Sequence, residues 1–369
     1  MTKFNQRAIQ LQPYVVSKRF EGRHDGEWLF LDWNETTYEL PGSVKAKLKD
    51  AIDRGLGVFY PDGDQSDVLD ALQKFTGVPT QNILVFNGSD SALKDCIECL
   101  LDPGDEILVV EPEYSQINTY VQMAASKLDR IKFTNPFELD IEELIATVVG
   151  KKIIYLSNPS NPTGRYISKS VIKKLLDTGI CILLDEAYVE FAPESCADLV
   201  LTYSNLFVFR TFSKAFGLAG LRLGYVLSNC ENINILRKNR NSKEINAFAQ
   251  IAVVEALNNI DLYRERISEI VSIRDTFIGN INHMDPRICA FHSNANFVLI
   301  KTPMLSELLR NLENHKILIR DRRGMYLMDD CARVSIGTPE QMDRLTSLIR
   351  SFYLNSISII ESTFGDNAN

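Results

Sequence analysis

The sequence predicts an α/β fold in which helices cover both faces of a mostly parallel central sheet, joined to a smaller α+β domain. Short apolar runs, such as residues 83–86 and 181–184, alternate with segments whose apolar residues recur at helical spacing. These runs are apolar at every position, which is typical of strands buried on both faces of a parallel sheet. The last third of the chain mixes strand and helix patterns, and 369 residues suit about two domains.

We place the large domain at residues 41–258. Turn residues such as those at 102–104 end its helical patterns. Its helices are expected at 41–54, 66–75, 93–100, 115–125, 169–177 and across 231–258. Its strands are expected at 83–86, 106–110, 152–157, 181–184, 206–209 and 225–228.

The smaller domain is expected to combine residues 1–40, an N-terminal arm, with residues 259–369. The arm carries a short strand pattern near 28–33. Residues 261–281, 305–314 and 342–353 have helical spacing, and 296–300, 317–320 and 332–336 read as strands.

Composition excludes several classes of function. The net charge of -8 and the pI of about 5.3 argue against nucleic acid or an anionic membrane surface as a partner. No apolar run approaches the ~20 residues of a membrane span, so we expect a cytoplasmic protein. The four histidines have no paired ligand spacing, and the C-x-x-C of Cys96 and Cys99 lies in an apolar helical pattern that favours structural burial, so we expect no metal site.

Lys214 is the first candidate for chemistry. It follows the apolar run 206–209, and small and apolar residues flank it. A lysine whose pKa is lowered by such surroundings can act as an amine nucleophile and form a Schiff base. Thr211, Ser213 and Arg222 bracket it with groups that suit a phosphate. An amine beside a phosphate site suggests pyridoxal phosphate (PLP); the alternative is an ordinary solvated lysine.

Three further loops follow predicted strands, where ligands bind in an open parallel sheet. Residues 87–90 open a helix whose free N–H groups suit a phosphate, although such turns also serve as simple caps. Two prolines stiffen 158–164 around Asn161, which is otherwise only a rigid turn. Asp185 ends a buried strand, where a carboxylate needs a cationic partner such as a protonated pyridine, and Tyr188 lies three residues on. The alternative for Asp185 is a helix cap.

These segments resemble the fold-type I PLP enzymes and, within them, the histidinol-phosphate aminotransferases. The resemblance extends over nearly the whole chain, and 210–225 and 185–191 are its most specific parts. Supporting segments are 11–14, 34–35, 60–62, 87–90, 102–105, Tyr114, 158–164, 319–321 and 333–338.

The resemblance implies a role for each cofactor-binding residue. Lys214 would form the Schiff base with the PLP aldehyde and shuttle a proton, and Asp185 would keep the ring nitrogen protonated. Asn161 and Tyr188 would bond the ring hydroxyl, and Tyr114 would stack on the ring. The phosphate would be held by the backbone amides of Ser89 and Asp90, by Thr211 or Ser213, and by Arg222.

The resemblance also implies a homodimer with shared active sites and a phosphorylated substrate. Tyr60 would reach the cofactor phosphate of the neighbouring subunit. Arg333 would bind the carboxylate or phosphate of the substrate, and Arg320 and Tyr14 would contact its phosphate end. The implied reaction moves an amino group between a histidinol-phosphate-like amine or amino acid and the pair 2-oxoglutarate and glutamate.

Two other activities remain open from the sequence. A decarboxylase of a phosphorylated amino acid would use the same lysine and cofactor. A non-catalytic PLP-binding regulator would need a DNA-binding domain ahead of the fold, for which the segments beginning near Tyr14 leave no room. The chain also departs from the family pattern at 36–39 and 240–246, and at Glu113, where the family has a small hydroxyl residue.

Overall fold

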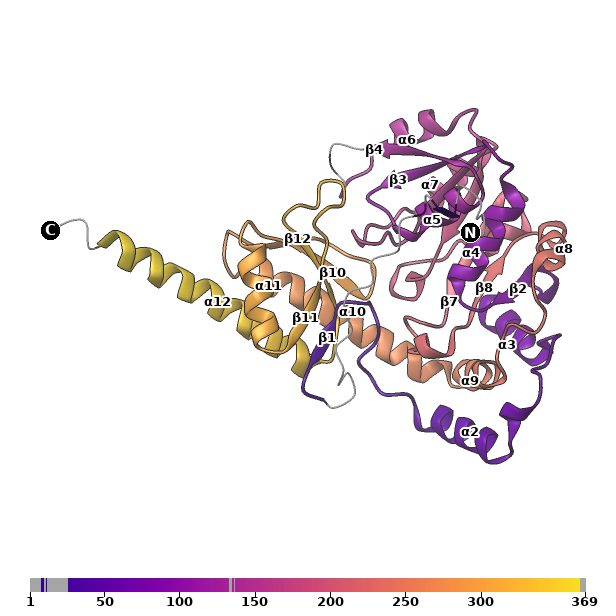
Figure 1. The fold of residues 1–369 in the computed structure, drawn as a ribbon, viewed down its shortest axis with the longest axis horizontal. Coiled ribbons are helices and arrows are strands. Elements are labelled where there is room, and N and C mark those ends of the chain that lie inside the picture. The colour runs from indigo at the N-terminus through magenta and orange to yellow at the C-terminus, as the bar shows by residue number, and fades with distance from the viewer. Residues whose placement is uncertain (1–7, 10, 12–25, 133–134, 136, 366–369) are drawn as a thin grey trace.

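The computed structural model describes residues 8–9, 11, 26–132, 135 and 137–365. Its larger part is built on a seven-stranded sheet with the strand order β2-β8-β7-β6-β5-β3-β4 (Figure 1). The strands are β2 Ile83–Phe86, β3 Glu106–Glu111, β4 Lys127–Lys132, β5 Ile153–Ser157, β6 Cys181–Asp185, β7 Leu206–Thr211 and β8 Gly224–Leu227.

The predicted parallel sheet is confirmed, with one reversed strand. β8 runs antiparallel to both of its neighbours, β2 and β7, and all other pairs are parallel. Every residue of β5 and of β7 is buried, as the unbroken apolar runs require. The carboxyl ends of β2, β5, β6 and β7 therefore lie at one edge of the sheet.

Helices cover both faces of this sheet. One face packs against α4 Ser89–Leu100, α5 Gln116–Met123 and α8 Cys230–Asn239. The other packs against α3 Ser66–Thr76, α6 Ile141–Val148, α7 Lys169–Asp177 and α9 Ala247–Asn258, with α2 Gly42–Asp53 lying on α9. This layering is the α/β arrangement expected from the sequence.

A second sheet of five strands forms the smaller part, in the order β1-β11-β12-β10-β9. Its strands are β1 Leu29–Leu31, β9 Cys289–Ala290, β10 Phe297–Lys301, β11 Ile317–Asp321 and β12 Cys331–Ser335. Its helices are α10 Ile260–Asn282, α11 Leu305–Asn314 and α12 Pro339–Gly365. β1 pairs with β11, so the N-terminal arm joins this sheet.

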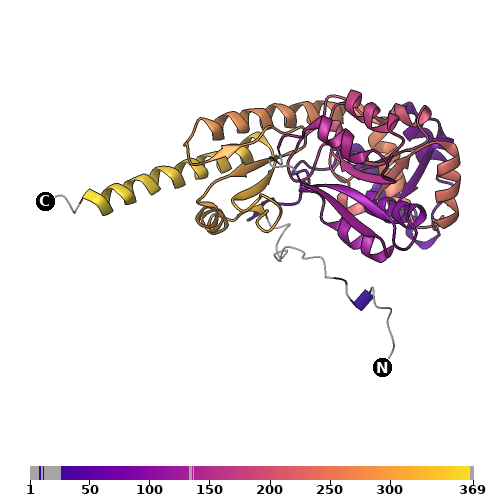
Figure 2. The same ribbon diagram turned by 90° about the horizontal axis from the view of Figure 1, so that it is seen from above.

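The two parts share one apolar core. The helix α10 contacts α9 on the large side and β9, β10 and α12 on the small side (Figure 2). One cluster of buried side chains runs through both sheets without interruption. The far half of α12 projects away from the body of the molecule in both ribbon views. No helix in the described part of the chain is long and apolar enough to span a membrane.

The structure corrects four details of the prediction. The single helix expected across 231–258 is two helices, because Asn246 caps the start of α9 by accepting a hydrogen bond from the Ala249 N–H. β4 was not predicted, since its sequence Lys127–Lys132 is largely polar and forms a sheet edge. The short helix α6 and the two-residue strand β9 were missed as well.

Candidate active site

A cavity of about 710 Å³ lies at the carboxyl edge of the large sheet, where the smaller sheet meets it. It is lined by residues that follow β2, β5, β6 and β7, and by residues of β11 and β12. Twelve of the predicted site residues line it: Ser89, Asp90, Tyr114, Asn161, Asp185, Tyr188, Thr211, Ser213, Lys214, Arg222, Arg320 and Arg333.

One end of the cavity is formed by the start of α4 and by the turn after β7. Ser89 is the first residue of α4, so free backbone N–H groups point toward this end. The Thr211 Oγ1 lies 3.0 Å from the Ser213 Oγ, and the Arg222 Nη1 lies 3.4 Å from that same Ser213 oxygen. Gly88 has a φ of 89°, which L side chains rarely adopt, so this turn requires glycine, and a Cβ there would also come within 2.6 Å of the Arg222 guanidinium. Hydroxyls, guanidinium and helix terminus together form an anion site.

Asp185 ends β6 and faces the cavity. Its carboxylate accepts hydrogen bonds from the Tyr155 hydroxyl at 2.9 Å and from the Ala187 N–H at 3.0 Å. Burial raises the pKa of Asp185 to about 6, although these two donors and the nearby Lys214 favour its ionised form. A cation placed against this carboxylate would therefore be strongly favoured.

Lys214 lies on the turn after β7. Its Nζ donates to the Trp33 carbonyl at 3.0 Å and lies 5.8 Å from the centre of the Tyr188 ring. Burial, with the positive charge of Arg333, lowers the pKa of Lys214 to about 8. A substantial fraction of this amine is therefore neutral near pH 8 and able to act as a nucleophile.

A chain of hydrogen bonds connects the middle of the cavity to the smaller sheet. The Tyr188 hydroxyl accepts from the side-chain amide of Asn34 at 2.9 Å and from that of Asn161 at 3.3 Å. The side-chain oxygen of Asn161 accepts a hydrogen bond from the Arg333 Nη1 at 2.5 Å. The Arg333 Nη2 also donates to the backbone carbonyl of Asp32 at 2.8 Å. The two domains are thus joined through the side chains that line the site.

The two predicted substrate arginines come together. Arg320 on β11 and Arg333 on β12 are direct partners across the antiparallel pair, so their side chains leave the same face of the sheet. Both line the cavity. Arg333 is only 6% exposed, and its guanidinium lies 5.3 Å from the centre of the Phe297 ring.

One predicted residue in the described part of the chain lies away from this cavity. Tyr60 is 81% exposed and lines a different cavity of about 460 Å³, between α2 and α9. The Lys243 ammonium lies 4.4 Å from the centre of its ring. Tyr14 lies outside the described residues.

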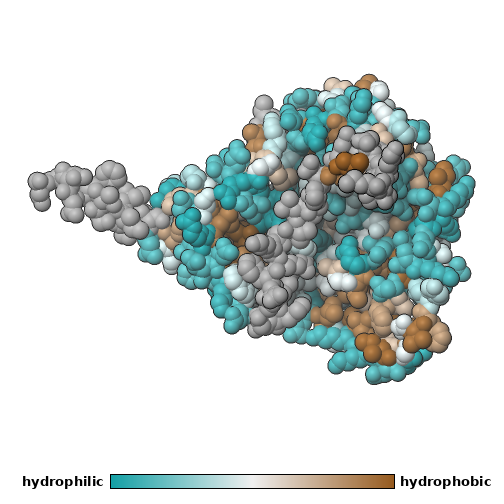
Figure 3. Space-filling model, in the orientation of Figure 1, coloured by the Kyte–Doolittle hydropathy of each residue, from teal (hydrophilic) through white to brown (hydrophobic). Residues whose placement is uncertain are grey.

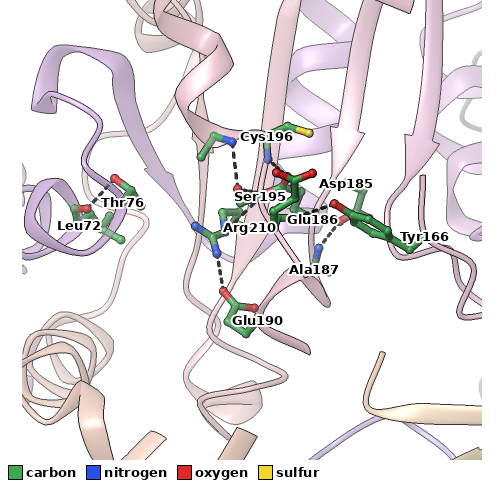
Figure 4. A network of polar contacts seen from close by, with 12 residues as sticks. Leu72, Thr76, Tyr166, Asp185, Glu186, Ala187, Glu190, Ser195, Cys196 and Arg210 are labelled. Atoms are coloured by element: carbon green, nitrogen blue, oxygen red, sulfur yellow. Dashed lines mark hydrogen bonds and ion pairs between the residues drawn. The ribbon is translucent and has the colours of Figure 1, made fainter. Parts of the chain in front are cut away.

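Behind the cavity, Arg210 on β7 forms a buried ion cluster with two glutamates (Figure 4). Its Nη2 donates to Glu190 at 2.8 Å, and its Nε lies 3.8 Å from the Glu186 carboxylate. The Ser195 hydroxyl and the Cys196 N–H also donate to Glu186, each at 2.6 Å. Because Glu186 follows Asp185 directly and Arg210 precedes Thr211, this cluster fixes the ends of β6 and β7 relative to each other.

Several residues of the site were missed at the sequence level. Asn34 was noted only as part of a matching segment, and Tyr155 is indistinguishable from a core aromatic in its apolar strand. Arg322 also lines the cavity, two residues after Arg320. Glu113 lies directly behind the wall and is 6% exposed. The departure from the family pattern at Glu113 was the available signal for this residue.

The donor set fits PLP. Lys214 supplies an amine for the aldehyde, and the buried Asp185 carboxylate gains from a protonated ring nitrogen. Tyr188 and Asn161 line the same cavity, and the side-chain amide of Asn161 donates to the Tyr188 hydroxyl. The anion site at the start of α4 suits the phosphate. Within the described ranges, no group of three or more His, Cys, Asp or Glu side chains is arranged to hold a metal ion.

The chain is similar to known proteins over most of its length. Residues 27–349 match the family of class I and II aminotransferases. A histidinol-phosphate aminotransferase from Cytophaga hutchinsonii is 32% identical over 331 residues, covering 88% of this chain and 92% of the relative. A dihydroxyacetone phosphate transaminase from Campylobacter jejuni is 33% identical over 358 residues, covering 94% and 96%.

A solved structure also matches over most of its length. It is the histidinol-phosphate aminotransferase from Sinorhizobium meliloti in complex with pyridoxal-5'-phosphate, with a TM-score of 0.83, 25% identity, and coverage of 95% of this chain and 99% of that one. The chain therefore belongs to the class I and II aminotransferases and is a PLP-dependent transaminase of fold type I, similar to the histidinol-phosphate aminotransferases.

Proposed function

We propose that this enzyme moves an amino group between a phosphate-bearing amine or amino acid, of the histidinol-phosphate kind, and the pair 2-oxoglutarate and glutamate. The observation that carries this proposal is the placement of Arg320 opposite Arg333 on one wall of the cavity that contains Lys214. Two guanidiniums side by side suit a dianion, since each presents a fork of N–H donors to phosphate oxygens.

The names of the relatives support a phosphate group on the substrate and do not specify the rest of its structure. The Cytophaga hutchinsonii relative is named for histidinol phosphate and the Campylobacter jejuni relative for dihydroxyacetone phosphate. These two compounds share a phosphate and a carbon that exchanges an amine with a carbonyl. We therefore assign the phosphate to Arg320, with Arg333 binding a carboxylate or phosphate of either substrate.

The other residues of the cavity then have defined tasks. PLP, when bound, supplies an electron sink for the bond that breaks at the amine-bearing carbon. Asp185 would keep the ring nitrogen protonated, and Asn161 and Tyr188 would bind the ring oxygen. Lys214 would hold the aldehyde carbon through its Nζ and, once displaced, would move a proton at that atom. The backbone N–H groups of Ser89 and Asp90, with Thr211 or Ser213 and with Arg222, would hold the phosphate of the cofactor.

The two half-reactions, followed one after the other, test this function. Holoenzyme is mixed with phosphorylated amines and with their dephosphorylated forms, and the change in cofactor absorbance is followed. We expect conversion with phosphorylated amines only, and recovery of the starting spectrum with 2-oxoglutarate. Equal efficiency toward both forms of one amine would contradict the proposal. Release of CO2 from a phosphorylated amino acid would instead identify a decarboxylase.

We also propose that the active unit is a homodimer in which Tyr60 contributes to the partner's cofactor site. Val58, Phe59 and Tyr60 are 80%, 74% and 81% exposed, an apolar run that one chain leaves uncovered. Apolar residues gather over α2 and the segment after it in the space-filling view (Figure 3). Mixing inactive Tyr60→Ala and Lys214→Ala subunits should restore activity. No recovery despite proven subunit exchange would count against a shared site.

A further inference from the structure

The inference concerns Glu113, a buried carboxylate that the proposed mechanism does not use. Glu113 lies between β3 and α5, one residue before Tyr114, and is 6% exposed. Its Oε1 accepts from the Tyr114 N–H at 2.8 Å, and its Oε2 accepts from the Ser157 N–H at 3.3 Å. Glu113 therefore ties together two segments that both line the cavity.

The position of this bridge follows from the sheet. β3 and β5 pair in register only at Leu108 with Ile154 and at Val109 with Tyr155. Beyond that point the backbone ladder stops, and the buried N–H of Ser157 needs another acceptor. The side chain of Glu113 reaches across and supplies it. The Glu113 side chain thus links the ends of β3 and β5 beyond their last backbone pair.

Both segments held in this way carry predicted cofactor-binding groups. The Tyr114 hydroxyl donates to Asp90 at 2.9 Å, so the Tyr114 ring is held from its backbone and from its tip. On the other side, the Ser157 hydroxyl accepts from the Asn161 N–H at 2.9 Å. A shift of Glu113 would move the ring of Tyr114 relative to Asn161.

The surroundings of Glu113 disfavour the ionised form of its carboxyl group. Burial raises the pKa of Glu113 to about 8, and the negative charge of Asp185 adds to this effect. The two N–H donors and the positive charge of Arg165 offset part of the cost. With a pKa of about 8, Glu113 is mostly protonated and uncharged at pH 7, and its two oxygens can still accept both N–H bonds, whereas a glutamine amide offers only one acceptor oxygen.

We propose that Glu113 is a positioning residue that holds the Tyr114 ring at a fixed distance from the end of β5, and so sets how tightly and in which orientation PLP is bound. This inference rests on the proposed placement of PLP between Tyr114 and Asn161.

The test measures cofactor binding to the apoprotein, with activity set aside. Glu113→Gln is the main variant, because glutamine can accept only one of the two N–H bonds and turns a donor toward the other. Glu111→Gln is the matched control: it removes a carboxylate two residues earlier whose side chain is 21% exposed and paired with Arg130 on the surface. PLP affinity, the visible circular dichroism of the bound cofactor and apoprotein unfolding are measured for each.

We expect Glu113→Gln to weaken PLP binding about tenfold and to reduce the circular dichroism, which reports ring orientation. Glu111→Gln should bind PLP within about twofold of the unchanged protein. In a double-mutant cycle, Glu113→Gln should cost less than about threefold once Tyr114→Ala has removed the ring. Glu113→Asp, which keeps both acceptor oxygens on a shorter arm, should recover part of the affinity.

The outcomes separate the inference from the proposed function. Unchanged affinity and circular dichroism in Glu113→Gln, with a loss in Tyr114→Ala, would overturn the positioning role and leave the cofactor site standing. Equal losses from Glu113→Gln with and without the Tyr114 ring would also overturn it. Unchanged affinity in both Tyr114→Ala and Lys214→Ala would instead overturn the proposed cofactor site itself, and the inference with it.

Discussion

Asp185 and Glu186 are adjacent acidic residues at the end of β6, yet their surroundings differ completely. Asp185 opens onto the cavity, and its two hydrogen-bond donors, Tyr155 and Ala187, are neutral. Glu186 is 1% exposed and belongs to the ion cluster with Arg210. Successive residues of a strand point to opposite faces, so one carboxylate serves the site and the other serves the scaffold.

This difference shows how a functional buried carboxylate can be distinguished from a structural one. Burial raises the pKa of both carboxyls. Glu186 is satisfied within the chain by Arg210, Ser195 and Cys196. Asp185 lies against a cavity large enough for a ligand, and a cationic ligand would stabilise its charge. The cavity, rather than the shifted pKa, therefore separates a functional acid from a structural one.

The largest expected effect comes from removing the charge on the cavity side. Asp185→Asn should lower turnover roughly 10³-fold, because the ring nitrogen loses the group that holds its proton. The apoprotein should nevertheless become more stable at pH 7. The pKa of Asp185 is about 6 in the folded chain, against roughly 4 when unfolded, so its ionisation costs stability as pH rises from about 4 to about 6. Steady-state kinetics and apoprotein melting curves check the two effects, and near-normal turnover would contradict the assignment.

Arg210→Met, in the ion cluster behind the cavity, should instead destabilise the folded protein. It leaves Glu186 and Glu190 buried without their cation, which typically costs about 3–5 kcal/mol of unfolding free energy. Denaturant unfolding of the apoprotein measures this loss. Arg130→Met serves as the control, because its ion pair with Glu111 lies at the surface and should contribute less than about 1 kcal/mol. A similar cost for both variants would show that the cluster does not stabilise the fold.

Removing Arg320 from the cavity wall should have an intermediate effect on kcat/KM that depends on the substrate. Arg320→Ala should cut kcat/KM for the phosphorylated substrate by roughly 30-fold, since a lost charge-assisted contact costs about 2–5 kcal/mol. The same change should affect glutamate less, because Arg333 is expected to bind its carboxylate. Parallel kinetics with both substrates check this split. Equal losses for the two would place Arg320 outside the phosphate site.

The last prediction concerns the pH dependence of Lys214, which needs no substitution. The pKa of this lysine is lowered to about 8, and only its neutral form attacks an aldehyde. The rate at which the apoprotein captures PLP should therefore rise about tenfold per pH unit up to about pH 8 and then level off. Stopped-flow absorbance measures this rate. A plateau reached only near pH 10.5 would mean that the lysine is not shifted.

Most of the fold could be predicted from the sequence, because parallel strands buried on both faces are apolar at nearly every position. β2 and α7 have the predicted bounds, and the parallel sheet between helices is as expected. β4 could not be predicted, since an edge strand exposes one side and tolerates lysine and arginine. Tyr155 was hidden for the converse reason: a buried strand residue looks apolar until its hydroxyl is seen to donate to Asp185.

The residues of the site were predictable to different degrees. Motifs that follow strands, such as Asp185 and Lys214, could be placed at one edge of the sheet from topology alone. The proximity of Arg320 and Arg333 depended on a guess about strand pairing, and the register of β11 and β12 shows that they are direct neighbours. The bridge made by Glu113 could not be foreseen, because it depends on where the ladder between β3 and β5 ends.

The facing arginines have a consequence for the behaviour of the free protein. Like charges directly opposite on antiparallel strands repel each other, so Arg320 and Arg333 strain the pairing of β11 with β12 until an anion arrives. Any small dianion that binds there would relieve this strain and stabilise the folded state by mass action. Inorganic phosphate or sulfate should thus raise the melting temperature while inhibiting competitively. A phosphate or sulfate buffer is therefore expected to compete with the substrate in an assay.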